Sequence, residues 1–334
     1  MTISARMQRL SFSVEQLIRI LSMKLILAPA AYALPRKLAL ALANALALSL
    51  VILPRPGLET YWQMRSAFGK SRQDSFYLAW GWLARPFRDF VVLKRLLYKR
   101  ENPFNWRIVE RNVDGINSLR ESGEPYIIAN AHFAKEPGFS AFSPGVTYGH
   151  PVQVADTPLK RIRSLYDLRN RIQYGTLLKA IFSCYGRDTE IIFSGSDLRT
   201  ARTLYKRLCK RGNVVFIAVD APWQKNLTGS TYERPFAGHK SRVFPTGAAQ
   251  LARMTQCPII SCACSLESDG TIVLEWGSPI RCVGNRAEND LKVMDELLNV
   301  LEVAIGERPT QYIFEIGRDR RWNSQSKRWE DLTE

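Results

Sequence analysis

Short apolar runs alternate with amphipathic segments from about residue 105 onward. The runs are rich in Val and Ile and bounded by Gly, Pro, Asp or Asn, which predicts strands over residues 126–131, 151–155, 190–194, 213–220, 258–265 and 271–276. Helical spacing of the apolar positions predicts helices between them, over residues 159–172, 196–211, 246–255 and 290–305. Strands that alternate with helices in this way predict an α/β fold, with a mostly parallel sheet flanked by helices.

The N-terminal part of the chain carries longer apolar runs. Residues 38–54 read LALALANALALSLVILP without a charge, which is the short limit for a helix that spans a bilayer. Three interpretations are open: a secretory signal peptide, which the small residues Ala43 and Ala45 would suit, a buried helix, and a membrane anchor or interfacial helix. We expect the third, and predict an N-terminal membrane-associated helical region over residues 1–60 and a second domain over residues 61–334. Basic residues on both flanks leave the orientation open.

Residues 80–100 combine bulky aromatic side chains with basic ones in the segment WGWLARPFRDFVVLKRLLYKR. Aromatic rings and cations are both favoured among lipid headgroups, so the segment could rest on a membrane surface. It could equally be an amphipathic helix that packs on the domain and leaves its charges in water. The sequence leaves both interpretations open.

The net charge of +16 favours anionic partners such as phospholipid headgroups, nucleic acid or an acidic protein. Neither zinc-finger spacing nor an RNA-recognition signature accompanies this charge, so nucleic acid is not an expected partner. The six cysteines form no paired CxxC clusters, and we expect reduced thiols packed as small apolar residues rather than a metal site or a disulfide framework. Cys262 and Cys264 alternate along a predicted strand and would share one of its faces.

Two predicted strands end in side chains that could carry out chemistry. The run YIIANAHFAKE delivers His132 and then Glu136, and NVVFIAVDAPW delivers Asp220. In open α/β sheets the site tends to lie beyond the carboxyl ends of strands. His132 is the best candidate general base, because a neutral imidazole accepts a proton near neutral pH and a nearby carboxylate can fix its tautomer. Pro137 biases Glu136 away from helical geometry, so a loop conformation would be needed to bring Glu136 to the ring.

Four blocks of the sequence, in order, resemble the bacterial lipid A late acyltransferases, the lauroyl and myristoyl acyltransferases related to lysophospholipid acyltransferases. YIIANAHFAKE is similar to the family's first block, and RGNVVFIAVDAPW to its segment of a basic residue, Gly, an apolar strand and Asp. ERPFAGHKSRVFPTGAAQLARMTQCPII resembles the Pro-Phe-x-Gly block with the helix and strand that follow, and RPTQYIFEIGRDRRW the C-terminal segment. The resemblance covers roughly residues 60–322. It implies a glycerolipid-acyltransferase-like fold and makes residues 61–334 an acyltransferase domain.

The first block departs from the family in one respect. The family has four residues between the histidine and the acid, whereas this sequence has three between His132 and Glu136, with Pro137 where the acid would fall. Glu136 could serve from a loop that is one residue shorter, Asp220 could take over the role, or the activity could be lost. We favour the first explanation.

The family implies direct transfer of a fatty acyl group from a thioester, on acyl carrier protein or coenzyme A, to a lipid A precursor or related glycolipid. His132 would be the general base with Glu136, and backbone N–H groups or a basic side chain would stabilise the oxyanion. We expect neither a cofactor nor a metal. Two alternatives remain: an acyltransferase for a different acceptor, such as a lysophospholipid or an aminolipid, and a non-catalytic membrane lipid-binding protein on the same fold.

Further residues are expected to bind substrates: Asp220, Arg163, Arg169, Arg171, Lys240 and Arg242. The three arginines of the basic helix would hold acceptor phosphates, because guanidinium groups pair bidentately with them. Lys240 and Arg242 would do likewise or contact the acidic acyl carrier protein. The expected setting is the cytoplasmic face of the bacterial inner membrane, in contact with phospholipid through the N-terminal region, and the expected pathway is lipopolysaccharide biosynthesis.

Overall fold

The computed structural model describes residues 3–53, 57–141, 143–156, 162, 164–185, 189–194, 198–221, 230–282, 287–314, 316, 320–323 and 328–331. Within these residues a seven-stranded sheet has the order β1-β9-β8-β2-β5-β3-β4. Its strands are β1 (Ile108–Arg111), β2 (Tyr126–Asn130), β3 (His150–Asp156), β4 (Glu190–Ser194), β5 (Asn213–Ala218), β8 (Ile259–Leu266) and β9 (Ile272–Trp276). Every neighbouring pair is parallel except β8 and β9. The predicted α/β class and mostly parallel sheet are therefore confirmed.

All six predicted strands are present; β4 has the predicted ends, and no end of the other five differs from the prediction by more than two residues. Three further elements were not predicted: β1, the hairpin of β6 (Thr231–Phe236) and β7 (His239–Pro245), and the pair β10 (Arg320–Asn323) and β11 (Arg328–Asp331). Strand β6 is mostly exposed or half-buried, and charged residues interrupt the buried positions of β7, so neither strand has the continuous apolar run by which a buried strand is predicted.

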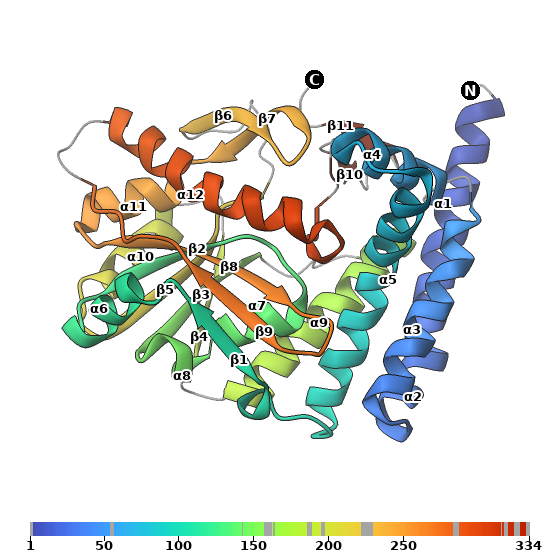
Figure 1. Ribbon diagram of the computed structural model, residues 1–334, viewed down its shortest axis with the longest axis horizontal. Coiled ribbons are helices and arrows are strands. Elements are labelled where there is room, and N and C mark those ends of the chain that lie inside the picture. Colours follow the sequence, from blue (N-terminus) through green and yellow to red (C-terminus); the bar gives the residue numbers. More distant parts are fainter. Residues whose placement is uncertain are drawn as a thin grey trace.

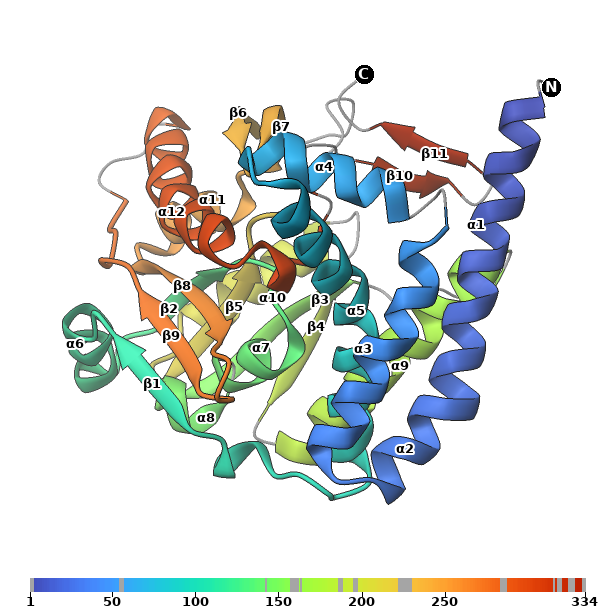
Figure 2. The same ribbon diagram turned by 45° about the vertical axis from the view of Figure 1, so that its right-hand side comes forward.

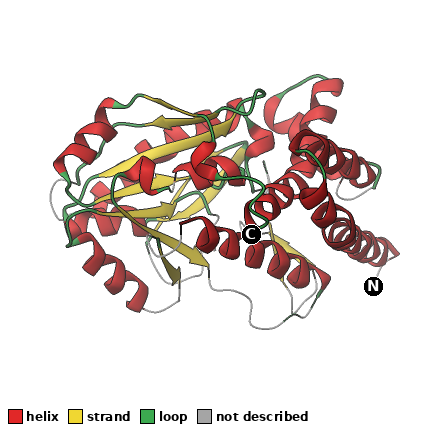
Figure 3. Ribbon diagram, turned by 90° about the horizontal axis from the view of Figure 1, so that it is seen from below, coloured by secondary structure: helices red, strands yellow, loops and turns green. Residues whose placement is uncertain are grey.

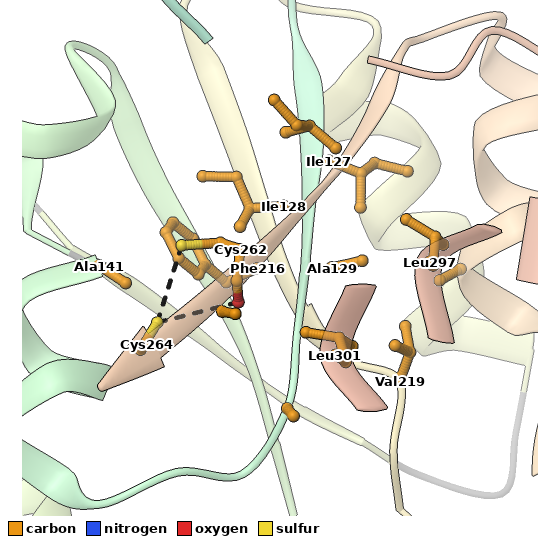
Figure 4. Packing of buried hydrophobic residues seen from close by; sticks show 14 of the residues in the cluster. Ile127, Ile128, Ala129, Ala141, Phe216, Val219, Cys262, Cys264, Leu297 and Leu301 are labelled. Carbon is orange, nitrogen blue, oxygen red and sulfur yellow. Dashed lines mark hydrogen bonds between the residues drawn. The ribbon is translucent and has the colours of Figure 1, made fainter. Parts of the chain in front are cut away.

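Strand β2 lies in the middle of the sheet and is buried on both faces, as expected for a central parallel strand. Figure 4 shows Ile128 on the same side as Cys262 and Cys264 of β8, while Leu297 and Leu301 lie on the side of Ala129. The two sulfur atoms of these cysteines are 3.7 Å apart, so the predicted shared face is confirmed.

The helices of the domain cover both faces of this sheet (Figure 3). They are α6 (Asp114–Ser122), α7 (Lys135–Ala141), α8 (Pro144–Thr147), α9 (Leu165–Tyr185), α10 (Leu198–Leu208), α11 (Gly247–Thr255) and α12 (Ala287–Glu307). Three predicted helices agree with α10, α11 and α12. The fourth differs, because α9 begins at Leu165 and continues to Tyr185, whereas the prediction covered residues 159–172. The additional turns contain Gly175 and a mixed set of side chains with little amphipathic periodicity.

The N-terminal helices stand beside the α/β domain, at the right of Figure 1 and Figure 2. They are α1 (Ile3–Leu21), the π-helical turn η1 (Ser22–Leu27), α2 (Ala28–Ala33), α3 (Arg36–Val51), α4 (Glu59–Phe68) and α5 (Arg72–Leu97). Helix α3 buries Ala39, Ala43, Ala47 and Leu50, which recur on one face, against Leu83, Ala84 and Phe87 of α5. Small residues on α3 thus allow a close approach of the two helices.

Helix α5 joins the two parts of the molecule. Ser71 caps its N-terminus by accepting a hydrogen bond from the N–H of Asp74 at 3.1 Å. Phe87 and Phe90, which could have faced lipid headgroups, are buried in the cluster with α3, and Trp80 donates to the Asn44 carbonyl at 2.9 Å. Of the two interpretations of residues 80–100, the structure therefore supports the packed helix for these side chains.

Among the described residues, none of the helices combines the length and the apolar composition that a bilayer crossing requires. The membrane association of residues 1–60 stays a prediction, and so does the domain boundary at residue 60.

Candidate functional site

The candidate site lies at the carboxyl ends of β2 and β5, which are neighbours in the sheet. Asn130 at the end of β2 is level with Ala218 at the end of β5, and the Val219 N–H donates to the Asn130 carbonyl at 3.0 Å. His132 follows β2 by two residues, and Asp220 follows β5 by two residues. Parallel strands in this register bring the two side chains to the same edge, although they are 88 positions apart in the sequence.

His132 and Asp220 are held together by two hydrogen bonds. The imidazole Nδ1 lies 2.7 Å from Asp220 Oδ1, and the His132 backbone N–H donates to Oδ2 at 2.9 Å. The Asp220 side chain is fully buried, whereas about a third of the His132 side chain is exposed. An ionised carboxylate only accepts hydrogen bonds, so Nδ1 carries the proton. The Nε2 lone pair is then the one available to a substrate.

Asp220 carries a negative charge in this site. Burial by itself would raise the pKa of its carboxyl, but the charge and hydrogen bonds of His132, together with the charge of Arg242, bring that pKa below its ordinary value. The carboxylate is therefore ionised at neutral pH and stabilises positive charge that develops on the ring.

Beneath this pair, Arg242 and Tyr312 form a buried layer. Arg242 Nη1 donates to the Tyr312 hydroxyl at 2.8 Å, and neither side chain reaches the surface. Burial, followed by the charge of Asp220, raises the pKa of Tyr312 well above its ordinary value, so its phenol stays protonated. The guanidinium carbon lies 5.5–5.9 Å from the centres of four rings: Phe236, Phe244, Tyr312 and Phe314. Packing of this kind leaves Arg242 one fixed orientation toward Asp220.

Ile313 and Phe314 of the C-terminal segment contact His132. The Ile313 N–H donates to the His132 carbonyl at 2.8 Å, and the Phe314 ring meets the imidazole edge to face with the ring centres 4.8 Å apart. These contacts fix the His132 backbone and one side of its ring. The segment belongs to the last of the four sequence blocks, where no reactive side chain had been singled out.

The other predicted site residues have different positions, and among those that the structure describes only Arg242 acts on Asp220. Glu136 lies in α7, and its side chain is outside the described residues, as is Arg163. Arg169 is half-buried on α9 and lies over Tyr166, whereas Arg171 and Lys240 are exposed. Arg242 differs from expectation, because full burial places it away from any surface that a carrier protein could contact.

Sequence reasoning missed the layer below the pair. Tyr312 stands in the fourth sequence block without a predicted role, and the role expected for Arg242 was to bind a phosphate or the carrier protein. Their common signal is aromatic content: the rings around Arg242 come from PF, VF and YIF in two separate blocks, but only the fold shows that they surround one cation.

All six cysteines are free thiols; four are buried as expected, whereas Cys184 is half-buried and Cys209 is exposed. Burial raises the pKa of Cys184 to about 11, and the pKa values of Cys257 and Cys282 are raised for the same reason. Within the described ranges no group of three or more His, Cys, Asp or Glu side chains could hold a metal ion.

Comparison with known proteins gives one family. Residues 196–321 match the family described as bacterial lipid A biosynthesis acyltransferase, which confirms the predicted family over that part of the chain. The matched region contains Asp220, Arg242 and Tyr312, while His132 lies before it. A comparison with curated proteins found no match.

Proposed function

We propose that this chain, an acyltransferase of the bacterial lipid A biosynthesis family by its residues 196–321, moves a fatty acyl group from a thioester to a hydroxyl of a lipid A precursor or related glycolipid. The observation that carries the proposal is the imidazole of His132 oriented by the buried carboxylate of Asp220. In this arrangement Asp220 has the role of carboxylate partner to His132, which the sequence analysis assigned to Glu136. A role for Glu136 stays a prediction.

The chemistry follows from the tautomer. Nε2 of His132 takes the proton of the acceptor hydroxyl as its oxygen attacks the thioester carbonyl carbon, and Asp220 stabilises the imidazolium. The tetrahedral intermediate expels the thiolate, which takes the proton back from Nε2. One ester and one thiol result, with no covalent bond to the enzyme. Donors that stabilise the oxyanion are supplied by backbone N–H groups or a basic side chain.

Substitution of His132 tests this function. His132→Ala should abolish acyl transfer from an acyl carrier protein thioester to a lipid A precursor in detergent micelles, while circular dichroism shows the wild-type fold. His150→Ala, in a histidine exposed at the opposite end of β3, is the matched control and should keep full activity. A fully active His132→Ala protein would refute the assignment.

The class of lipid that accepts the acyl chain can be identified by a separate measurement. Mass spectrometry of membrane lipids, from cells with the wild-type chain and cells with His132→Ala, should show one acyl chain missing from a glycolipid in the variant. A missing chain on a lysophospholipid or an aminolipid would move the enzyme to that acceptor class.

We also propose that the N-terminal helices rest on a membrane. More than half of the exposed large apolar side chains in the described residues lie between residues 10 and 77, including Leu25, Ile52 and Trp62. Side chains of this size on one part of a monomer favour a lipid surface, and a net charge of +16 favours an anionic one.

Vesicle binding tests the membrane contact. The wild-type chain should co-sediment with phosphatidylglycerol-containing vesicles, and a Leu25→Gln, Ile52→Gln, Trp62→Gln variant should bind them at least tenfold more weakly. Met254→Gln, at an exposed apolar residue of α11, should bind like wild type. Equal binding by both variants and wild type would place the lipid contact elsewhere.

A further inference from the structure

A cluster of basic side chains lies next to the candidate site, where the N-terminal helices meet the α/β domain. Its cations come from four helices: Arg19 of α1, Arg85 of α5, Lys135 of α7 and Arg169 of α9. Helix α9 contacts both α1 and α5, and α5 contacts α7, so the four residues face one junction. Arg19 and Arg85 are only 3% and 8% exposed.

The charges in this junction do not balance. Among the side chains that the structure describes at this junction, two carboxylates pair with the four cations: Glu15 lies 2.8 Å from Arg19 Nε, and Asp89 lies 3.4 Å from Arg85 Nη1. Asp89 also accepts the Lys135 backbone N–H at 3.1 Å. These described side chains therefore carry an excess of two positive charges in a region largely shielded from water. Such burial of unpaired charge costs folding free energy unless an anion binds there.

Several donor atoms in the junction have no partner. In the part of the chain that the structure describes, Arg85 Nε, Arg19 Nη1 and Arg169 Nε are buried without a hydrogen bond. On α1, the Gln16 side amide is 1% exposed, and its donor Nε2 likewise has no hydrogen-bond partner among the described residues. Buried donors of a folded protein normally have acceptors, so these atoms indicate a ligand with several oxygen atoms.

The cations also act on one another. Burial, then the charges of Arg19 and Arg169, lower the pKa of Arg85 to about 10, with Asp89 opposing them in part. Burial likewise lowers the pKa of Lys135, and the charge of Arg85 adds to the effect. A bound anion would relieve this repulsion.

The junction is coupled to the catalytic histidine by a short path. Arg85 Nη2 donates to the Ile313 carbonyl at 3.3 Å, and the Ile313 N–H donates to the His132 carbonyl at 2.8 Å. Lys135 is three residues after His132. Arg169 and Lys135 are half-buried, so the cluster is in contact with solvent on their side.

We propose that this junction is a binding site for a phosphate ester of a substrate, held by Arg19, Arg85, Lys135 and Arg169. The proposal rests on the proposed acyl transfer and deepens it. An excess of two charges matches a phosphate monoester, which carries nearly two negative charges at neutral pH, better than a diester with one. The monoester would belong to the acceptor lipid, and the diester to the pantetheine arm of the donor.

Binding of inorganic phosphate to the purified full chain tests the site without catalysis. Replacement of chloride by phosphate at constant ionic strength should raise the Tm of wild type and of Lys179→Gln, which removes an exposed cation of the same helix. Arg169→Gln should lose at least three quarters of that rise. A wild-type Tm that does not respond to phosphate, or an equal rise in Arg169→Gln, would overturn the site.

Steady-state kinetics then separate the two sources of the phosphate. Arg169→Gln should raise the KM of a phosphorylated acceptor about tenfold to a hundredfold, the range for one charge-assisted hydrogen bond, with the donor KM unchanged. A rise in the donor KM alone would assign the site to the pantetheine phosphate and keep the anion chemistry. The Tm response to phosphate in His132→Ala measures the anion site in a protein that should lack acyl transfer. The anion site and the acyl-transfer function can therefore each fail without the other.

Discussion

Replacement of Asp220 by Asn exchanges one carboxylate oxygen for an NH₂ group and removes the charge with little change in shape, yet the geometry predicts a large loss of activity. Asp220 accepts from two donors of one residue, the ring Nδ1–H at 2.7 Å and the backbone N–H of His132 at 2.9 Å. An amide offers one acceptor and one donor. If its oxygen meets the backbone N–H, its NH₂ forces the ring proton onto Nε2, and the base is lost. If its oxygen meets the ring, two N–H groups face each other.

The magnitude can be bounded from this geometry. Loss of the carboxylate that orients a catalytic imidazole costs roughly 10³–10⁴-fold in kcat, or about 4–5.5 kcal/mol of transition-state stabilisation. One charge-assisted hydrogen bond is lost in the folded state, and Arg242 loses a nearby countercharge. We therefore expect the free energy of unfolding to fall by about 1.5–3 kcal/mol. Because the binding surfaces are unchanged, the KM of either substrate should stay near its wild-type value.

The assay is transfer of an isotope-labelled acyl chain to a lipid acceptor in micelles, with urea unfolding followed by circular dichroism. Asp269→Asn makes the same chemical change in an exposed turn and should leave kcat unaltered. The His132→Ala, Asp220→Asn double variant should be no slower than His132→Ala alone, since the two side chains act as a unit. Wild-type kcat in Asp220→Asn, with activity lost in Glu136→Gln, would refute the reasoning and restore Glu136 as the partner.

Three further predictions concern the rest of the molecule. The pKa of Asp220 is lower in the folded protein than its ordinary value of 3.8, so the ionised carboxylate stabilises the fold above that pH. The difference in unfolding free energy between wild type and Asp220→Asn should therefore shrink as the pH falls below 3.8. Urea titrations at several pH values measure this difference. Gly238→Ala should cost about 1–3 kcal/mol, because Gly238 has φ +81° and a Cβ there would lie 2.8 Å from the Cβ of Ala67. By contrast, Gly175→Ala, with open space in α9, should stabilise the chain by about 0.5–1 kcal/mol, and an equal effect of both changes would contradict the geometry. Iodoacetamide should label the exposed Cys209 in the native protein and Cys262 and Cys264 only after denaturation, as mass spectrometry can show; native labelling of the latter pair would mean that β8 opens.

Short apolar runs separated by amphipathic segments were enough to predict the α/β architecture. The predicted strands are short, mostly apolar runs, and the central ones, β2 and β8, are covered on both faces, so the information lies within a few neighbouring residues. The same reasoning failed where tertiary contacts decide. Strand β1 is a four-residue strand with alternating exposure, and its pairing with β9 brings together residues more than 160 positions apart. Helix α9 owes its length to contacts with α1 and α5 rather than to its own periodicity.

The sequence by itself was enough to select His132 as the candidate base, because a histidine directly after a predicted strand is visible in the local pattern. The four ordered blocks likewise indicated the family. Which carboxylate meets that histidine was decided only by the tertiary structure. The register of β2 and β5 sets Asp220 against the imidazole across 88 positions. Likewise, the burial of Arg242 and the gathering of four cations at the helix junction depend on how distant segments pack. Charge in a sequence says nothing about solvent exposure, and exposure determines whether an arginine is a surface contact, a buried partner of a carboxylate or part of an anion site.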